Sequence, residues 1–295
     1  MGLRLVPPLR RGLLTSPLRE LWARRLIEQS WAERLAGRAE RPSAAAGLLV
    51  SLTSHAPRFG TLALTLKSLL LQQLRPDSVL LWIGHGDLAA LPAEVLDLEA
   101  HGLRIMACDD HGSHTKYVHA LRAYPNHRIA ICDDDIYYRL GWLAELDAAD
   151  RPGEIACHRI HRVTLDARGL PEPYPLWEHD SKAEDISPLN FPTGVGGALL
   201  RRDRFDPRVL DMDLARSLCP TSDDLWLYWM AGLAGTRIRR AGRYQPLIVW
   251  RTSQEVALWR VNVAARANDR QMAAMIGHFG RGGPFGAERA DVQVA

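Results

Sequence analysis

The sequence predicts an α/β fold: a mixed, mainly parallel sheet flanked by helices, with an N-terminal helical extension. The chain has 295 residues, of which 47% are hydrophobic and 24% are charged, a composition that allows a sizeable buried core. From residue 46 onward, short apolar segments alternate with amphipathic helical patterns, as in parallel sheets covered on both faces. We expect one globular domain over residues 46–280, a basic extension over 1–45 and a flexible tail over 281–295.

The extension carries the basic charge of the chain. Residues 1–45 contain nine Arg and four Glu, a net charge of +5, which leaves −2 for the remainder because the whole chain has +3. A helical pattern starts at Pro17 and ends near Gly37, with apolar residues at helical spacing beside arginines. One interpretation is a peripheral contact with an anionic membrane. The other, which we favour slightly, is a helix packed on the domain or on a partner.

The alternation that predicts the sheet consists of five apolar segments and the helical patterns between them. Strands are expected at residues 47–54, 78–84, 103–108, 128–132 and 154–163, and helices at 60–74, 91–100, 114–123 and 139–148. After about residue 165 the pattern weakens. A helix is expected from Asp223 through Met230, strands within 236–250 and helical structure over 254–279.

Cysteine usage and hydropathy indicate the compartment. The four cysteines are far apart and form no C-x-x-C pair, which fits reduced thiols in a cytosol. No run of about 18 apolar residues could span a bilayer, and arginine or proline interrupts every apolar run at the N-terminus. We therefore expect a cytoplasmic protein, soluble or peripheral at the inner face of the membrane. Nucleic acid is not an expected partner, because the arginine excess lies in the extension without a recognisable binding module.

Three adjacent aspartates, Asp133, Asp134 and Asp135, follow directly after the apolar segment 129–131. Carboxylates this close repel one another and are costly to bury, so packing does not explain them. Mn²⁺ or Mg²⁺ would relieve the repulsion, because both ions accept oxygen ligands. Residues i and i+2 of an extended segment point the same way, so we expect Asp133 and Asp135 to share the ion and Asp134 to face elsewhere, toward a ribose. The alternative is an acidic loop that caps the next helix.

A second acidic pair, Asp223 and Asp224, precedes an aromatic helical segment that contains Trp226. Helix capping is one explanation, because acidic residues stabilise the N-terminus of a helix. The other is a general base at the rim of an acceptor pocket to which Trp226 contributes. The pair alone favours neither explanation.

Two further features fit the same chemistry. The segment 192–198 holds three glycines, which lets the backbone approach a ligand closely, so Gly196 and Gly197 are candidates for the acceptor side. A turn between strands is an equal alternative. Lys116 is one of three lysines and lies on the helix before the acidic strand, where its ammonium could meet a diphosphate. A solvated surface lysine is the default explanation.

In their order along the chain, these motifs resemble inverting glycosyltransferases of the GT-A (Rossmann-like) fold. The closest similarity is to family 2 and to bacterial surface-polysaccharide transferases. The resemblance covers roughly residues 46–235. It rests on the segment 49–58, the aspartates at 133–135, the glycines at 196–197 and the pair at 223–224.

The resemblance implies a role for each matching residue. The turn after the first strand holds the nucleotide in that family, which implies donor contacts for Thr53, Ser54 and Arg58. An acidic residue after the second strand meets the base or ribose, and Asp87 is the candidate, although the family's usual form there is richer in acids. The family's central D-x-D implies metal binding by Asp133 and Asp135, and its later acidic pair implies Asp224 as the base with Asp223 as its orienting neighbour.

The expected function is therefore metal-dependent, inverting transfer of a sugar from a nucleotide-sugar donor to a glycan or lipid-linked acceptor, in bacterial surface-polysaccharide synthesis. A retaining enzyme is preferred if no base lies opposite the leaving group. A metal-dependent nucleotidyltransferase on a similar scaffold is the first alternative, but no Arg- or Lys-bearing glycine loop follows the first strand. The second is a non-catalytic protein that binds glycans or partners through the surface near Trp226 and Trp229.

Overall fold

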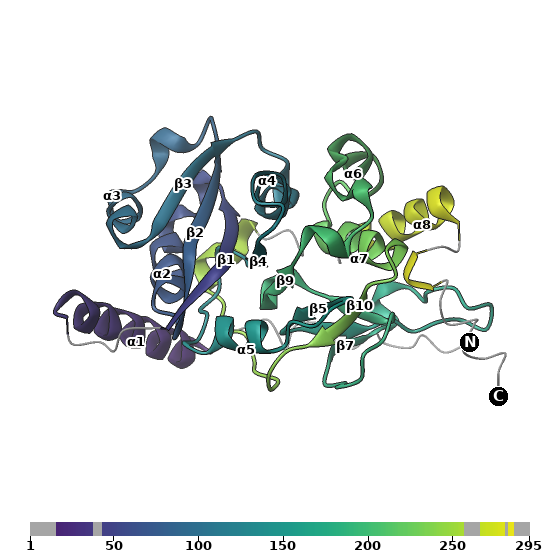
Figure 1. Cartoon of the computed structure of the whole chain (residues 1–295), viewed down its shortest axis with the longest axis horizontal. Coiled ribbons are helices and arrows are strands. Elements are labelled where there is room, and N and C mark those ends of the chain that lie inside the picture. Colours follow the sequence, from purple (N-terminus) through teal and green to yellow (C-terminus); the bar gives the residue numbers. More distant parts are fainter. Residues whose placement is uncertain (1–15, 38–42, 257–265, 281–282, 286–295) are drawn as a thin grey trace.

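The central element is a seven-stranded mixed sheet. The computed structural model describes residues 16–37, 43–256, 266–280 and 283–285 (Figure 1). The strand order is β10-β5-β9-β4-β1-β2-β3, and β9 alone runs antiparallel to its neighbours. The predicted mainly parallel α/β fold is thereby confirmed. The strands are β1 (Ser43–Ser54), β2 (Leu74–Gly84), β3 (Leu103–Cys108), β4 (Arg128–Ile131), β5 (Glu154–Cys157), β9 (Ala198–Leu200) and β10 (Arg237–Arg240).

The predicted single strand over 154–163 is wrong, because two strands of different sheets occupy this range. After β5, the backbone N–H of His158 donates to the carbonyl of Gly197, and the carbonyl of Arg159 accepts from Thr193. These contacts turn the chain out of the main sheet. It then enters a three-stranded antiparallel sheet of order β7-β6-β8, made by β6 (Ile160–Arg162), β7 (Glu178–Ser181) and β8 (Asn190–Pro192).

Helices cover both faces of the main sheet, so the core consists of two large apolar clusters. Side chains alternate along β1: Leu48, Val50 and Leu52 belong to the cluster that includes α2, and Leu49 belongs to the cluster that includes α4 and α7. Figure 1 shows α2 and α3 beside β1 to β3, and α6, α7 and α8 at the other end. The helices are α1 (Pro17–Leu35), α2 (Phe59–Leu70), α3 (Ala93–Leu96), α4 (Thr115–Ala123), α5 (Trp142–Ala148), α6 (Met212–Leu218), α7 (Asp223–Leu233) and α8 (Ala267–Phe279).

Helix α1 of the basic extension packs against α2 through one face. Ala23, Ile27 and Trp31 are buried, and Glu28 pairs with Lys67 at 3.1 Å. The other face carries exposed apolar side chains, led by Leu18, which is 77% exposed. No helix in the described ranges is long and apolar enough to cross a bilayer.

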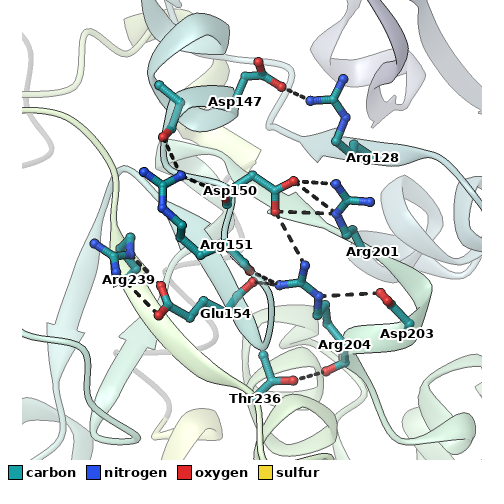
Figure 2. A network of polar contacts seen from close by, with 11 residues as sticks. Arg128, Asp147, Asp150, Arg151, Glu154, Arg201, Asp203, Arg204, Thr236 and Arg239 are labelled. Atoms are coloured by element: carbon teal, nitrogen blue, oxygen red, sulfur yellow. Dashed lines mark hydrogen bonds and ion pairs between the residues drawn. The ribbon is translucent and has the colours of Figure 1, made fainter.

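A charged network fixes the amino ends of β5 and β10, at the edge opposite the carboxyl ends of β1 and β4. Figure 2 shows Arg204 at its centre, donating to the backbone carbonyls of Arg151 and Glu154. Arg204 is 8% exposed, and Asp150 lies 2.5 Å from the neighbouring Arg201. The network joins four segments of the chain and so stabilises this end of the main sheet.

Replacing Arg204 with Met is expected to lower the free energy of unfolding by about 2–4 kcal/mol, since the buried guanidinium that bonds two backbone carbonyls and pairs with Asp150 is removed. Urea unfolding followed by circular dichroism measures the loss. Arg168→Met is the matched control, because the Arg168 side chain is 75% exposed beside Asp166 and such surface pairs contribute little. Equal stability of the two variants would show that the network is dispensable.

Candidate active site

Five aspartates gather where β4 ends and α7 begins. β4 ends at Ile131, and Asp133 follows after one residue, while Asp223 opens α7 behind the capping residue Ser222. The ammonium of Lys116, on α4, lies 2.7 Å from Asp133 Oδ1 and 2.8 Å from Asp223 Oδ2. The two acidic segments that the sequence singled out therefore meet at one lysine. Lys116 is buried, so the default explanation of a solvated surface lysine is wrong.

A second cation, the guanidinium of Arg58, holds the other two aspartates of the triplet. Arg58 Nη2 lies 2.7 Å from Asp134 Oδ1 and 2.6 Å from Asp135 Oδ2. Ser54 Oγ donates to Asp134 Oδ2 at 2.5 Å, and Ser253 Oγ donates to Asp135 Oδ2 at 3.2 Å. The end of β1 and the end of β4 are thus joined through three predicted donor-site residues, Ser54, Arg58 and Asp134.

The expected division of the triplet differs from the observed one. Asp133 and Asp135 were expected to converge, but Asp133 contacts Lys116 while Asp135 shares Arg58 with Asp134. The reason is local: β4 ends at Ile131 and the chain turns at Asp134 and Asp135, so the alternation of an extended strand does not apply. Asp134 is buried instead of facing a ribose.

Gly194 is the glycine that borders the carboxylates. Its backbone N–H donates to Asp224 Oδ1 at 2.7 Å. A Cβ at this position would lie 2.9 Å from that oxygen and 3.0 Å from Lys116 Nζ, so only glycine fits without displacing one of them. The sequence contained this signal in the glycine-rich segment, but it did not show which glycine approaches the site.

Close packing explains the two glycines that the sequence placed on the acceptor side, Gly196 and Gly197, without reference to an acceptor. A Cβ would lie 2.7 Å from the Cβ of Arg159 at Gly196, and 2.4 Å from Cζ2 of Trp142 at Gly197. Gly197 also has a φ of +95°, which side chains rarely adopt. These two glycines let the chain pass beneath larger side chains and are buried away from solvent.

The prediction that Trp226 lines an acceptor pocket is wrong. Its side chain is fully buried, and its indole N–H donates to the carbonyl of Val209 at 3.1 Å. Trp229, in the next turn of α7, is buried as well. Neither indole can form a binding surface, because α7 is packed on nearly all sides.

The remaining two predicted donor-site residues lie near the turn after β1. Thr53 Oγ1 donates to the carbonyl of Trp82 at 2.9 Å and so ties β1 to β2. Asp87 Oδ2 accepts from the backbone N–H of Ala56 at 3.2 Å, two residues before Arg58. The structure therefore brings Asp87 to the same turn as Ser54 and Arg58.

The adjacent residues Asp223 and Asp224 have pKa values that are shifted in opposite directions. Burial and the charge of Asp223 raise the pKa of Asp224 to about 7, against the opposing effect of Lys116. Burial acts on Asp223 in the same direction, but Lys116 and His114 outweigh it and lower the pKa of Asp223. Such a separation assigns different roles to two adjacent acids: Asp223 stays ionised beside Lys116, and Asp224 can exchange a proton near neutral pH.

A divalent cation fits the charge of this cluster. Four of the five carboxylates pair with only two cationic side chains, and burial raises the pKa of Asp135 to about 6 although Arg58 opposes the shift. Mg²⁺ and Mn²⁺ take oxygen ligands, and Asp133 is the most accessible member of the triplet, with 29% of its side chain exposed. Within the described part of the chain no three His, Cys, Asp or Glu side chains form a ready-made metal site. In this structure Asp135 Oδ2 is paired with Arg58, whose guanidinium nitrogen lies 2.6 Å away.

Comparisons with known proteins found similar solved structures but no similar sequence. No protein-family model and no curated protein sequence matches the chain. It is similar to the inositol-1-phosphate CTP transferase from T. maritima, with 10% identity, a TM-score of 0.42, and 79% of this chain and 97% of that one covered. It is also similar to 4-diphosphocytidyl-2C-methyl-D-erythritol synthase from Anaerococcus prevotii, with 12% identity and a TM-score of 0.45, over 74% of this chain and 96% of that one. A third similar structure is S. aureus TarS 1–349, with 13% identity and a TM-score of 0.43, over 79% of this chain and 72% of that one. Similarity this low supports no statement about substrates.

Proposed function

We propose that the chain transfers a sugar from a nucleotide-sugar donor to a hydroxyl group of an acceptor, with inversion, and that Asp224 is the general base. The observation that carries the proposal is the meeting of the two acidic segments at Lys116, where burial and the charge of Asp223 raise the pKa of Asp224 to about 7. A base with a pKa near the working pH is the most effective proton acceptor.

In the proposed reaction the acceptor oxygen bonds to the anomeric carbon as the bond to the diphosphate breaks. The hydroxyl proton passes to Asp224, and the bonding electron pair leaves with the nucleoside diphosphate. Lys116 and Arg58 are the two cations of the acidic cluster, and their positive charge would stabilise the diphosphate as its negative charge grows. Ser54, Asp87 and Asp134 fix the turn after β1, on which we place the nucleotide.

We further propose that Mn²⁺ or Mg²⁺ is held by Asp133 and Asp135. A bound divalent ion would neutralise charge on the departing diphosphate. Asp133 offers a partly exposed carboxylate, and Asp135 follows if the arriving diphosphate draws Arg58 away. The proposed acceptor is a glycan or a lipid-linked acceptor, which fits a role in bacterial surface-polysaccharide synthesis at the inner face of the membrane.

A thermal-shift screen of UDP-, GDP-, CMP- and dTDP-sugars, with and without Mn²⁺, tests the proposal. We expect one nucleotide class to raise the melting temperature, and to raise it further with Mn²⁺, because a ligand that binds only the folded state stabilises it. Free sugars and EDTA are the controls. Stabilisation by a nucleoside triphosphate, with release of pyrophosphate, would instead support the nucleotidyltransferase. No shift with any nucleotide would favour a non-catalytic protein.

A further inference from the structure

A cavity of about 500 Å³ lies between β8, α7 and α8, and none of the residues assigned to the donor lines it. Leu225, which follows Asp224 on α7, lines it. So does Phe191 of β8, three residues ahead of the Gly194 that contacts Asp224. The cavity is therefore bordered in part by α7, which carries Asp224, and by β8, which precedes the contact of Gly194 with Asp224.

One wall of this cavity is aromatic. The ring centroids of Tyr174 and Trp177 lie 4.9 Å apart, and those of Trp177 and Phe191 lie 5.3 Å apart, in tilted and edge-on arrangements. The Trp177 indole N–H donates to the carbonyl of Glu172 at 2.7 Å. Since its only polar atom is occupied, Trp177 offers the wall an apolar surface held in place by its neighbours.

The start of α8 adds polar side chains to the lining, beside the apolar Met272, Ala273 and Ile276 of the same helix. The side-chain oxygen of Asn268 is buried and has no hydrogen-bond partner among the described residues. A buried acceptor of this kind costs free energy unless a ligand donates to it. Two acidic and two basic side chains also line the cavity, so it holds no excess charge for an ionic ligand; they are Glu172, Asp269, Arg266 and Arg270.

We propose that this cavity binds the acceptor, and that the acceptor is an uncharged pyranoside whose apolar ring face lies against Tyr174 and Trp177. A sugar hydroxyl donates to Asn268, and another lies toward Asp224, to which it gives its proton on attack. Small-molecule sites combine an apolar wall with a few placed polar groups in this way. The inference rests on the proposed function for the identity of the reaction, but binding in the cavity can be measured without it.

The test is saturation-transfer NMR of the full chain with methyl and p-nitrophenyl hexopyranosides. We expect at least one glycoside to bind, and Ala273→Gln, which places a larger side chain on the cavity wall, to weaken it by about tenfold or more. Ala32→Gln is the matched control, an exposed alanine within α1. Asn268→Ala should weaken binding without lowering the melting temperature, because its side-chain oxygen forms no hydrogen bond within the described residues of the free protein.

Several results would overturn the inference. They are failure of every glycoside to bind, equal binding by Ala273→Gln, and binding of farnesyl phosphate at this cavity without any glycoside, which would point to a lipid phosphate. Nucleotide-sugar binding, measured by thermal shift on the same samples, separates the two proposals. Glycoside binding without nucleotide-sugar binding would remove the proposed function and leave the cavity as a carbohydrate site.

Discussion

Asp224→Asn is expected to lower the rate of sugar transfer by about 10²- to 10⁴-fold, because an amide cannot accept the proton of the acceptor hydroxyl. The asparagine oxygen can still accept from the backbone N–H of Gly194, so the loop around it should keep its position. Nucleotide-sugar binding should remain, since Asp223 keeps its contact with Lys116. Initial rates and thermal shifts measured on the same samples separate chemistry from binding.

The pH dependence gives a second measure of the same residue. Because Asp224 must be deprotonated to act as a base, kcat/KM of the wild type should rise with pH up to about 7 and then level off. The folded state binds an extra proton between the unfolded pKa of a carboxyl, near 4, and about 7, so this group makes the protein less stable as pH rises through that window. Asp224→Asn stays neutral and should be at least as stable as the wild type at pH 8.

The control for the Asp224 variant is an aspartate whose side chain is exposed to solvent. Asp213 lies on α6 with 95% of its side chain exposed, so Asp213→Asn should leave the rate and the pH profile unchanged. An Asp224→Asn protein that turns over normally would remove this residue from the mechanism. A protein that loses activity only because it unfolds at pH 8 would contradict the expected stability, and the loss of rate would then carry no information about the base.

The sheet could be predicted because its strands are apolar on both faces, and such segments stand out between amphipathic helices. The acidic segments stood out as well, since neither Asp133 to Asp135 nor the pair at 223–224 serves packing. Their common contact with Lys116 could not be predicted, because it depends on α4 and α7 being brought to the same strand end by the tertiary fold. Local sequence contains no such distance.

The error at Trp226 had a signal that sequence analysis could have used. Helix α7 is apolar around its whole circumference, and a helix of that kind is buried in a core and seldom has one face open to a ligand.

For the three glycines, the local sequence contained no such signal. Gly194, Gly196 and Gly197 have the same permissive backbone, and only the neighbours at each position show that one borders Asp224 and two lie beneath Trp142 and Arg159.

Lys116→Met is expected to have the largest combined effect on stability and activity. The ammonium is buried between Asp133 and Asp223, and removing one partner of a buried ionic cluster typically costs about 3–5 kcal/mol because the other charges stay uncompensated. Nucleotide-sugar binding should be lost with it, since no cation would remain at that end of the cluster. Lys182→Met, which removes a lysine that lies over the ring of Tyr244, is the control.

The double variant Lys116→Met/Asp223→Asn separates structure from function. Neutralising Asp223 removes one of the two carboxylates that the lysine compensates, so much of the lost stability should return, and urea unfolding of the four proteins in the cycle measures the coupling. Transfer should not return, because the diphosphate still lacks its cation. Recovery of both properties would show that Lys116 only balances charge within the fold. Recovery of stability alone places Lys116 among the residues that bind the donor.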